Sequence, residues 1–298
     1  MLLRIIGSSS ILVTLNLLIV SPLFSSDKVY LSKTSIDSIG DIVVVYLNGD
    51  TTSKTFVRPS YNTNLLFPFY KSSNTFFSVI PIPPDIRVKE LALYIERDGK
   101  VISSNTVILE YLDKIDMKPK KLTLPKQSRE ILKNKERISS DIHFIVNTIS
   151  KIELESFVSD RIPIFSLPST NRITSPFGVS RVYSDGRIRY HRGVDFSFEP
   201  DDNVYAVADG VVVISSNFLA NGESIYIYHG VGIVSSYFHL KERYVNAGER
   251  VMRGQIIGKI GQTGISTAPH LHLGMYVVGV GGYVAFNPLT FITNGQIQ

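Results

Sequence analysis

The first apolar block of the chain lies at its N-terminus. One basic residue, Arg4, is followed by residues 5–24, which are apolar apart from a glycine, an asparagine and a few Ser and Thr residues. Two serines then precede the first acidic residue, Asp27. This order is typical of a signal peptide, although its small-residue cleavage pattern is poorly met. The stretch is also nearly long enough to span a bilayer. We expect residues 1–26 to be a cleaved signal or a retained anchor, with a buried core helix as the third alternative.

Between residues 27 and 113, short β-branched runs alternate with turn residues. The four clearest runs are residues 42–47, 76–80, 91–95 and 101–109. The last two flank Asp98-Gly99, which is a hairpin signal. Several short strands separated by turns predict a small β-sandwich module. The module contains no cluster of catalytic residue types, so we expect a spacer or docking unit rather than a ligand site.

The pattern changes to a helical period between residues 114 and 160, which we interpret as a connector. From about residue 127 to residue 151, apolar residues recur at steps of seven, four, three and four, which places them on one face of a helix. They are Ile131, Ile138, Ile142, Ile145 and Ile149. We expect this stripe to pack against one of the flanking domains. The segment before it is basic and lies between two prolines, which predicts an extended segment exposed to solvent.

Residues 161–298 form a third region of short β runs separated by glycines. The clearest runs are residues 204–207, 211–215, 224–228 and 233–238. Little helix is expected here. The fold class predicted for the chain is therefore mainly β: a small N-terminal β-sandwich module, a helical connector, and a C-terminal all-β domain.

Composition and charge narrow the function classes. The 298 residues allow two or three domains, and 44% hydrophobic with 19% charged residues exclude a disordered chain. Cysteine is absent, which excludes disulfides, thiolate metal ligands and a cysteine nucleophile. Between Lys114 and Arg137, nine Lys and Arg residues face three acidic ones, whereas the whole chain carries only +5. Because the basic charge lies in the connector and not on the C-terminal domain, we expect no nucleic-acid partner.

Five of the six histidines lie in the C-terminal region. His191 and Asp195 have H-x-x-x-D spacing, and His270 and His272 have H-x-H spacing. Side chains alternate along a strand, so residues two apart share a face, as do residues four apart. Two imidazoles and one carboxylate suit Zn²⁺ and leave a tetrahedral position for water. Each spacing alone is more often ordinary polar packing, but a third histidine-bearing run around His239 makes the combination more specific.

The stretch from Thr174 to Pro288, about 115 residues, resembles the lysostaphin/LytM-type zinc metallopeptidases, which are peptidoglycan endopeptidases. The matching segments are residues 175–178 (SPFG), 191–196 (HRGVDF), 204–212 (VYAVADGVV), 227–230 (IYHG), 237–240 (YFHL), 248–251 (GERV), 254–258 (GQIIG), 261–264 (GQTG), 266–273 (STAPHLHL) and 287–289 (NPL). By this resemblance, residues 161–298 are a LytM-like domain with a groove over an antiparallel sheet.

The resemblance also implies roles for single residues. His191, Asp195 and His272 are the implied ligands of one Zn²⁺, and His239 and His270 are the implied catalytic histidines that are not ligands. The glutamate base of an H-E-x-x-H site is absent, so histidine must supply the acid and base; the sequence does not say which histidine is the general base.

The remaining polar and aromatic residues of this region have blander interpretations. His229 lies in a turn and His143 stands alone in the connector, and both are interpreted as structural. Tyr226, Tyr228 and Tyr237 could face the groove, but at strand period they more often pack in the sheet.

The resemblance implies an exported protein of the periplasm or cell envelope that cuts peptide cross-links of peptidoglycan, either D-Ala to diaminopimelate or glycine-rich bridges. Residues 5–24 would then be an inner-membrane anchor if they are not cleaved, and an envelope protein is a candidate partner for the β module.

The alternative is a catalytically silent regulator that activates another wall hydrolase, but all five implied residues are present. A non-enzymatic metal-binding or carbohydrate-binding protein is the third reading. The β module or the connector could also cover the cleft until released.

Overall fold

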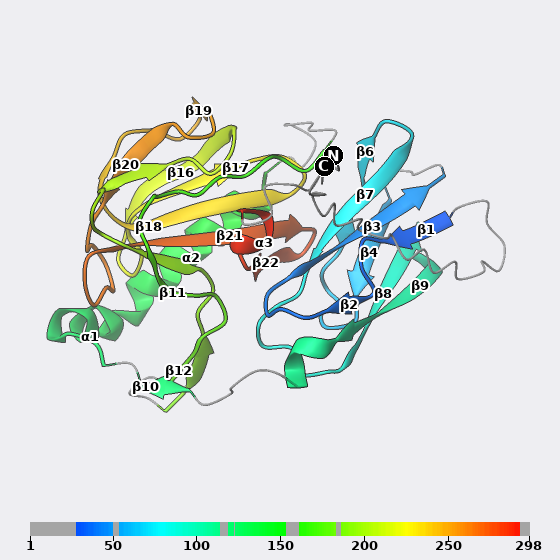
Figure 1. The fold of residues 1–298 in the computed structure, drawn as a ribbon, viewed down its shortest axis with the longest axis horizontal. Helices are drawn as coiled ribbons and strands as arrows, with labels where there is room; N and C mark the ends of the chain where they lie inside the picture. Colours follow the sequence, from blue (N-terminus) through cyan, green and yellow to red (C-terminus); the bar gives the residue numbers. More distant parts are fainter. Residues whose placement is uncertain are drawn as a thin grey trace, which may run out of the picture.

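The computed structural model describes residues 28–49, 54–113, 119–121, 123–152, 161–182 and 186–292. The predicted signal or anchor, residues 1–26, lies outside this set. Within the described residues, no helix is both long and apolar enough to cross a membrane. Figure 1 shows two β-rich lobes, one on each side of the molecule.

The N-terminal lobe contains two small sheets that enclose an apolar interior. One sheet has the order β1 (Lys28–Leu31), β3 (Ile42–Asn48), β7 (Thr75–Pro81) and β6 (Tyr70–Ser72). The other has the order β2 (Ser35–Ile36), β9 (Lys100–Leu109), β8 (Glu90–Arg97), β4 (Thr55–Pro59) and β5 (Phe67–Pro68), and a 3₁₀ turn follows at Glu110–Asp113. Asp98 and Gly99, between β8 and β9, both have positive φ, as a tight hairpin turn requires.

The C-terminal lobe is built on an antiparallel sheet of ten strands. Its main path is β11 (Ile173–Ser175), β14 (Val194–Ser197), β21 (His270–Gly279), β18 (Ile233–Arg243), β17 (Gly222–Tyr228), β16 (Gly210–Phe218) and β19 (Arg250–Val251). Three further strands, β15 (Asn203–Tyr205), β20 (Ile256–Ile260) and β22 (Gly282–Phe286), pair at its sides. A separate three-stranded sheet has the order β10 (Lys120–Lys121), β12 (Ser180–Val182) and β13 (Ile188–Tyr190). The short helix α3 (Leu289–Ile292) follows β22. The predicted mainly β fold class is confirmed.

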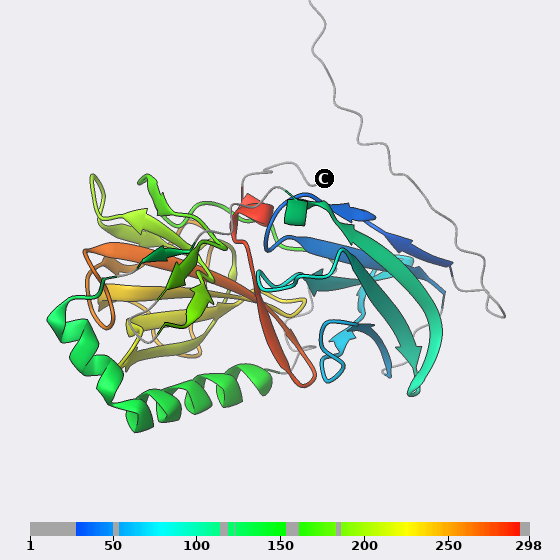
Figure 2. The same cartoon turned by 90° about the horizontal axis from the view of Figure 1, so that it is seen from below.

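The connector contains two helices where the apolar pattern predicted one. α1 (Lys126–Lys133) ends and α2 (Lys135–Ser150) begins at Asn134, whose side chain accepts a hydrogen bond from the backbone N of Arg137. Asn134 has φ −83° and ψ 68°, which is not helical, so the chain turns there. The side chain of an asparagine favours this capping position over the helix interior. Figure 2 shows the two helices at an angle to each other, along one side of the C-terminal lobe.

The predicted apolar stripe is also narrower than expected. Ile145 and Ile149 are buried against the C-terminal sheet, but Ile142 is 51% exposed. All three lie on α2, whose buried residues are Asp141, Ile145 and Ile149, one row at steps of four, so Ile142 lies beside the buried face and not on it.

The two lobes are joined by more than the connector. The hairpin of β21 and β22 reaches into the module, where Leu66 and Val280 exchange two backbone hydrogen bonds of 3.0 and 2.8 Å. The backbone N of Asn287 also donates to the carbonyl O of Gly40 at 2.7 Å. A side chain at Gly40 would collide with the ring of Phe177, so the backbone of the module lies directly on the C-terminal lobe. Buried residues of both lobes form one continuous apolar cluster.

Candidate metal centre

Strand register brings the predicted ligand residues together. β14 and β21 are antiparallel neighbours in which Asp195 lies directly opposite His272. His191 lies in the loop between β13 and β14, and it bonds back to Val179 and Gly178 through its backbone. The sheet therefore unites residues separated by up to 81 positions in the sequence.

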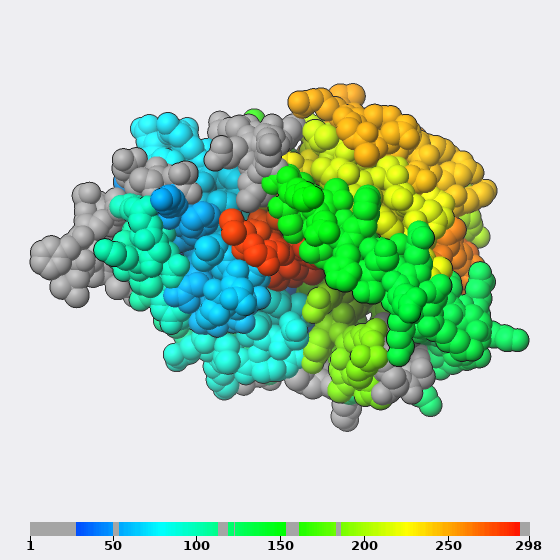
Figure 3. Space-filling view, turned by 180° about the vertical axis from the view of Figure 1, so that it is seen from behind, coloured from blue at the N-terminus to red at the C-terminus, as the bar shows by residue number. Residues whose placement is uncertain are grey.

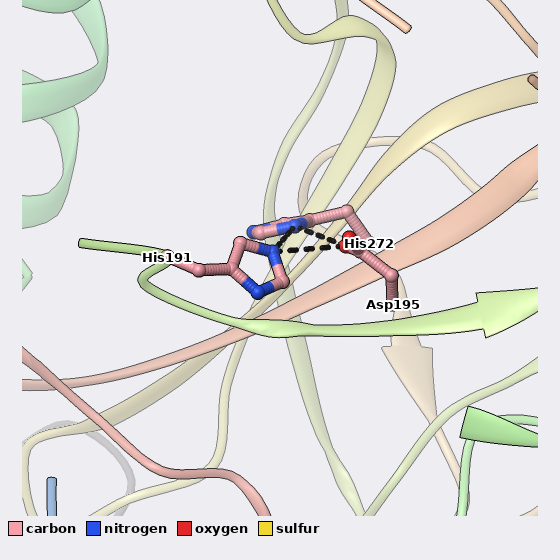
Figure 4. A group of neighbouring side chains, drawn as sticks. All are labelled: His191, Asp195 and His272. Atoms are coloured by element: carbon pink, nitrogen blue, oxygen red, sulfur yellow. Dashed lines mark hydrogen bonds and ion pairs between the residues drawn. The ribbon is translucent and has the colours of Figure 1, made fainter. Parts of the chain in front are cut away.

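Three side-chain atoms of these residues converge on one point (Figure 4). Nε2 of His191 lies 3.0 Å from Oδ1 of Asp195 and 3.1 Å from Nδ1 of His272. Nδ1 of His272 lies 2.8 Å from Oδ1 of Asp195. Among the described residues, this is the group of three or more His, Asp and Glu side chains that could hold a metal ion.

The donor set fits a divalent cation. Nδ1 of His191 lies 2.9 Å from the carbonyl O of Pro176, so we assign its ring N–H to that bond and a lone pair to Nε2. That lone pair points at a carboxylate oxygen and at a second imidazole nitrogen, and a cation is the natural partner for all three. Ligand atoms around tetrahedral Zn²⁺ stand about 3.3 Å apart, given bonds of about 2.0 Å. The observed separations are slightly shorter, so a small outward movement admits the ion.

An arginine that the sequence analysis did not single out supports the carboxylate. Nη2 of Arg181, on β12, lies 3.3 Å from Oδ2 of Asp195 and donates to Oγ of Ser175 at 2.7 Å. Burial by itself raises the pKa of Asp195, but the imidazoles of His191 and His272 lower it by more, and it lies well below its usual range. Asp195 is therefore ionised, as a metal ligand must be.

His239 and His270 lie beside the three donors, with their ring centroids 4.8 Å apart. Each is anchored through Nδ1 at 2.8 Å, His239 on the carbonyl O of Thr263 and His270 on that of Ala268. If Nδ1 carries the proton, Nε2 of each neutral ring has a free lone pair. Burial, followed by the charges of His270 and His272, lowers the pKa of His239 to about 3. His239 is thus neutral near pH 7.

Phe238 and Gly193 both pack against the imidazole of His272. The ring of Phe238 stacks on the imidazole with centroids 5.3 Å apart and planes 6° apart. A Cβ at Gly193 would collide with Nε2 of the same imidazole, which explains why glycine follows Arg192 in the H-x-G segment. The motifs contained Phe238 and Gly193, but neither had an assigned role because their partner lies far away in the sequence.

The other two histidines lie apart from this centre. His143 is exposed on α2. His229 is fully buried, with Nδ1 2.8 Å from the carbonyl O of Asp209 and Nε2 2.7 Å from Oγ of Ser235. Tyr226, Tyr228 and Tyr237 are all buried as well.

His229 should make the stability of the protein depend on pH. Burial lowers its pKa from 6.5 to about 4 in the folded chain. Between these values the unfolded chain binds more protons, so this contribution to stability is lost as pH falls from about 6.5 to about 4. We expect the free energy of unfolding to fall over this window, and His229→Gln to be less stable at pH 7 but to show a shallower fall. Urea unfolding of both proteins at several pH values measures this, and parallel curves would contradict it.

Comparison with known proteins identifies relatives of this region. Residues 189–288 match the model of Peptidase family M23. The peptidoglycan DD-endopeptidase ShyC of Vibrio cholerae is 41% identical over 110 residues, which are 37% of this chain and 25% of ShyC. The DD-carboxypeptidase/endopeptidase Mpg of Neisseria meningitidis is 37% identical over 101 residues, 34% of this chain and 23% of Mpg. The chain thus spans about a quarter of the length of these curated relatives.

A solved structure shares the wider architecture. The crystal structure of a Pseudomonas aeruginosa protein described as a peptidase M23 matches 87% of this chain and 96% of its own, with a TM-score of 0.58 and 20% identity. At that identity the match shows a common fold. The shared part is longer than the C-terminal lobe alone.

Proposed function

We propose that this chain is a zinc-dependent endopeptidase that hydrolyses peptide cross-links of peptidoglycan, because residues 189–288 match the model of Peptidase family M23, as the sequence motifs predicted. The observation that carries the proposal is the convergence of His191, Asp195 and His272 with two further histidines beside them. The names of the relatives ShyC and Mpg support the same class of substrate.

In this proposal, His191, Asp195 and His272 hold the zinc ion. When bound, the ion would supply a Lewis acid for the scissile carbonyl and acidify a water molecule. Two imidazoles and one carboxylate are the donor types of catalytic zinc sites that keep a position open. Arg181 orients Asp195 through the carboxylate oxygen that does not face the imidazoles.

His239 and His270 carry the protons. A neutral imidazole with its lone pair at Nε2 accepts a proton from the attacking water, and the protonated ring then donates it to the leaving amine. The carbonyls of Thr263 and Ala268 hold the opposite ring nitrogens, so each imidazole keeps its orientation while its charge changes. These two histidines replace the glutamate base that the sequence lacks.

We also propose that residues 1–26 direct export and that the protein acts in the periplasm or cell envelope, where peptidoglycan lies. The signal-like order of charged, apolar and small residues supports this. N-terminal sequencing of the protein from a membrane fraction and a soluble fraction would distinguish an anchor from a cleaved signal.

A silent regulator that only activates another hydrolase is the less favoured function. Asp195, His191 and His272 converge, and His239 and His270 adjoin them, so the chain keeps the complete set.

Metal removal tests the proposed function. We expect the purified zinc-loaded chain to release new amine termini from peptidoglycan, because an activated water cleaves an amide bond. A chelator should reduce this release to background, and added Zn²⁺ should restore it. Mass spectrometry of the soluble fragments identifies the bond. Using one peptidoglycan with D-Ala–diaminopimelate cross-links and one with glycine bridges separates the two substrates. Absence of new termini from both, or release that persists in chelator, would refute the proposal.

A further inference from the structure

The connector lies against the lobe that carries the candidate site. α2 packs against β16, β21 and β22, and the space-filling view in Figure 3 shows the connector, in green, spread over one side of that lobe. Apolar contacts through Ile145 and Ile149 account for part of this packing. Two buried polar side chains of the connector, Ser128 and Asp141, need a different explanation.

Ser128 of α1 is bonded to the loop that holds His270. Its side chain is 2% exposed, and its Oγ donates to the carbonyl O of Ser266 at 3.2 Å. Ser266 Oγ in turn lies 3.1 Å from Nδ1 of His270, and the carbonyl O of Ala268 lies 2.8 Å from the same nitrogen. Ser266 therefore links Ser128 of the connector to the imidazole of His270.

Asp141 of α2 is bonded to the loop that holds the backbone of His239. It is 7% exposed although it carries a charge, and its Oδ2 accepts from the backbone N of Leu219 at 2.8 Å. Two residues later, the carbonyl O of Asn221 accepts from the backbone N of His239 at 2.9 Å. His239 has φ +62°, a conformation that a residue with a side chain keeps only when its surroundings hold it.

The two loops are also locked to each other. The backbone N of Ile265 donates to the carbonyl O of Ala220 at 2.8 Å. Thr263 Oγ1 accepts from the backbone N of Glu223 at 2.9 Å, while the carbonyl O of Thr263 anchors the His239 ring. A displacement of either loop would therefore move the support of both histidines.

We propose that the connector positions the catalytic histidines, and that Ser128 and Asp141 are its positioning residues. The inference rests on the proposed function for its catalytic readout. Neither side chain is one of the three converging residues of the candidate metal centre, so each acts through a loop. Ser128 acts through residues 264–269 and Asp141 through residues 219–222. The connector is then a component of the catalytic unit.

Asp141→Leu in the full chain tests the proposal. The leucine fills the space but cannot accept the Leu219 N–H, so we expect kcat for peptidoglycan peptides to fall by about ten- to a hundredfold, the scale of a small misplacement of reacting groups. KM and the zinc content should stay as in the parent protein. Asp141→Asn keeps an acceptor oxygen and should restore most of kcat. The matched control is Arg137→Met, which removes only the 2.9 Å ion pair from Arg137 to Asp141 and should leave kcat unchanged.

Amide hydrogen exchange provides a readout that does not depend on activity. In Asp141→Leu, exchange at the amides of His239 and Ile265 should speed up by a larger factor than exchange at the amide of Val79 in the β module, which reports the stability of the whole body. Ser128→Ala should loosen Ile265 and lower kcat independently. If the wild-type chain cleaves nothing, the proposed function fails, and the exchange rates still decide whether the connector holds the loops. Unchanged exchange and kcat in both variants, an equal rise at Val79, or no rescue by asparagine would overturn the positioning role.

Discussion

Replacing Asp195 with alanine should remove metal binding and hydrolysis together. Asp195 supplies the only carboxylate of the donor group in the described structure, and it is buried at 7% exposure between two imidazoles. Without its charge, two neutral histidines remain, and they bind Zn²⁺ far less strongly than a His₂Asp set. We expect the zinc affinity to fall by more than the roughly 10–100-fold that follows loss of an outer hydrogen-bond partner.

A graded series makes this measurement sharp. Arg181→Met removes the outer partner of Asp195, so it should fall within the 10–100-fold range. Asp37→Ala removes an exposed aspartate of the module and should bind zinc like the parent protein. Zinc titration with a competing chromophoric chelator gives all three affinities. Asp195→Ala protein that retained stoichiometric zinc at the affinity of the parent would show that the ligand assignment is wrong.

Replacing His270 with alanine should abolish most of the hydrolysis while the metal stays bound. Its ring lies 4.8 Å from that of His239 and is anchored by the carbonyl O of Ala268. His270 is not one of the three residues proposed to hold the metal. Positioned acid–base groups contribute about 10²–10⁴-fold to rates, so we expect kcat to fall by that factor. His239→Ala should cause a loss of similar size if the two histidines divide the proton transfers.

His143→Ala is the matched control for both variants, because this histidine is exposed on α2. It should keep the activity and zinc content of the parent protein. The pH dependence of kcat in each active-site variant then shows which imidazole acts as the base. Cleavage at the parental rate by His270→Ala would remove this residue from the mechanism.

Local patterns predicted strands well and helix geometry less well. The pair Asp98-Gly99 predicted its hairpin because few residues tolerate positive φ, and that constraint acts on adjacent residues. The connector pattern predicted one helix over residues 127–151, yet one helix ends and a second begins at Asn134. Steps of three, four and seven report a helical period but not whether the axis continues. Asn134 was itself a readable signal, because an asparagine favours the position that caps a helix, and here its side chain accepts a bond from the backbone N of Arg137.

The candidate site was predictable where its chemistry repeats along a strand. His270 and His272 share a face of β21 because strand side chains alternate. The pairing of Asp195 with His272 depends on sheet register, which spacing alone does not specify; the family resemblance supplied it. Arg181, Ser128 and Asp141 were missed for the same reason. A serine and an aspartate in a polar helix look like solvated residues until the fold places a distant loop against them.

The exchange of hydrogen bonds between Leu66 and Val280 has a consequence for where the chain can be cut. A fragment that began at residue 161 would carry His191, Asp195 and His272, but its hairpin of β21 and β22 would end in unpaired amide and carbonyl groups at Val280, and its Phe177 would face water. The boundary drawn by motifs in the sequence therefore differs from the boundary of cooperative folding. By this geometry the N-terminal lobe covers groups that the C-terminal lobe would otherwise expose, and the two lobes should melt as one body.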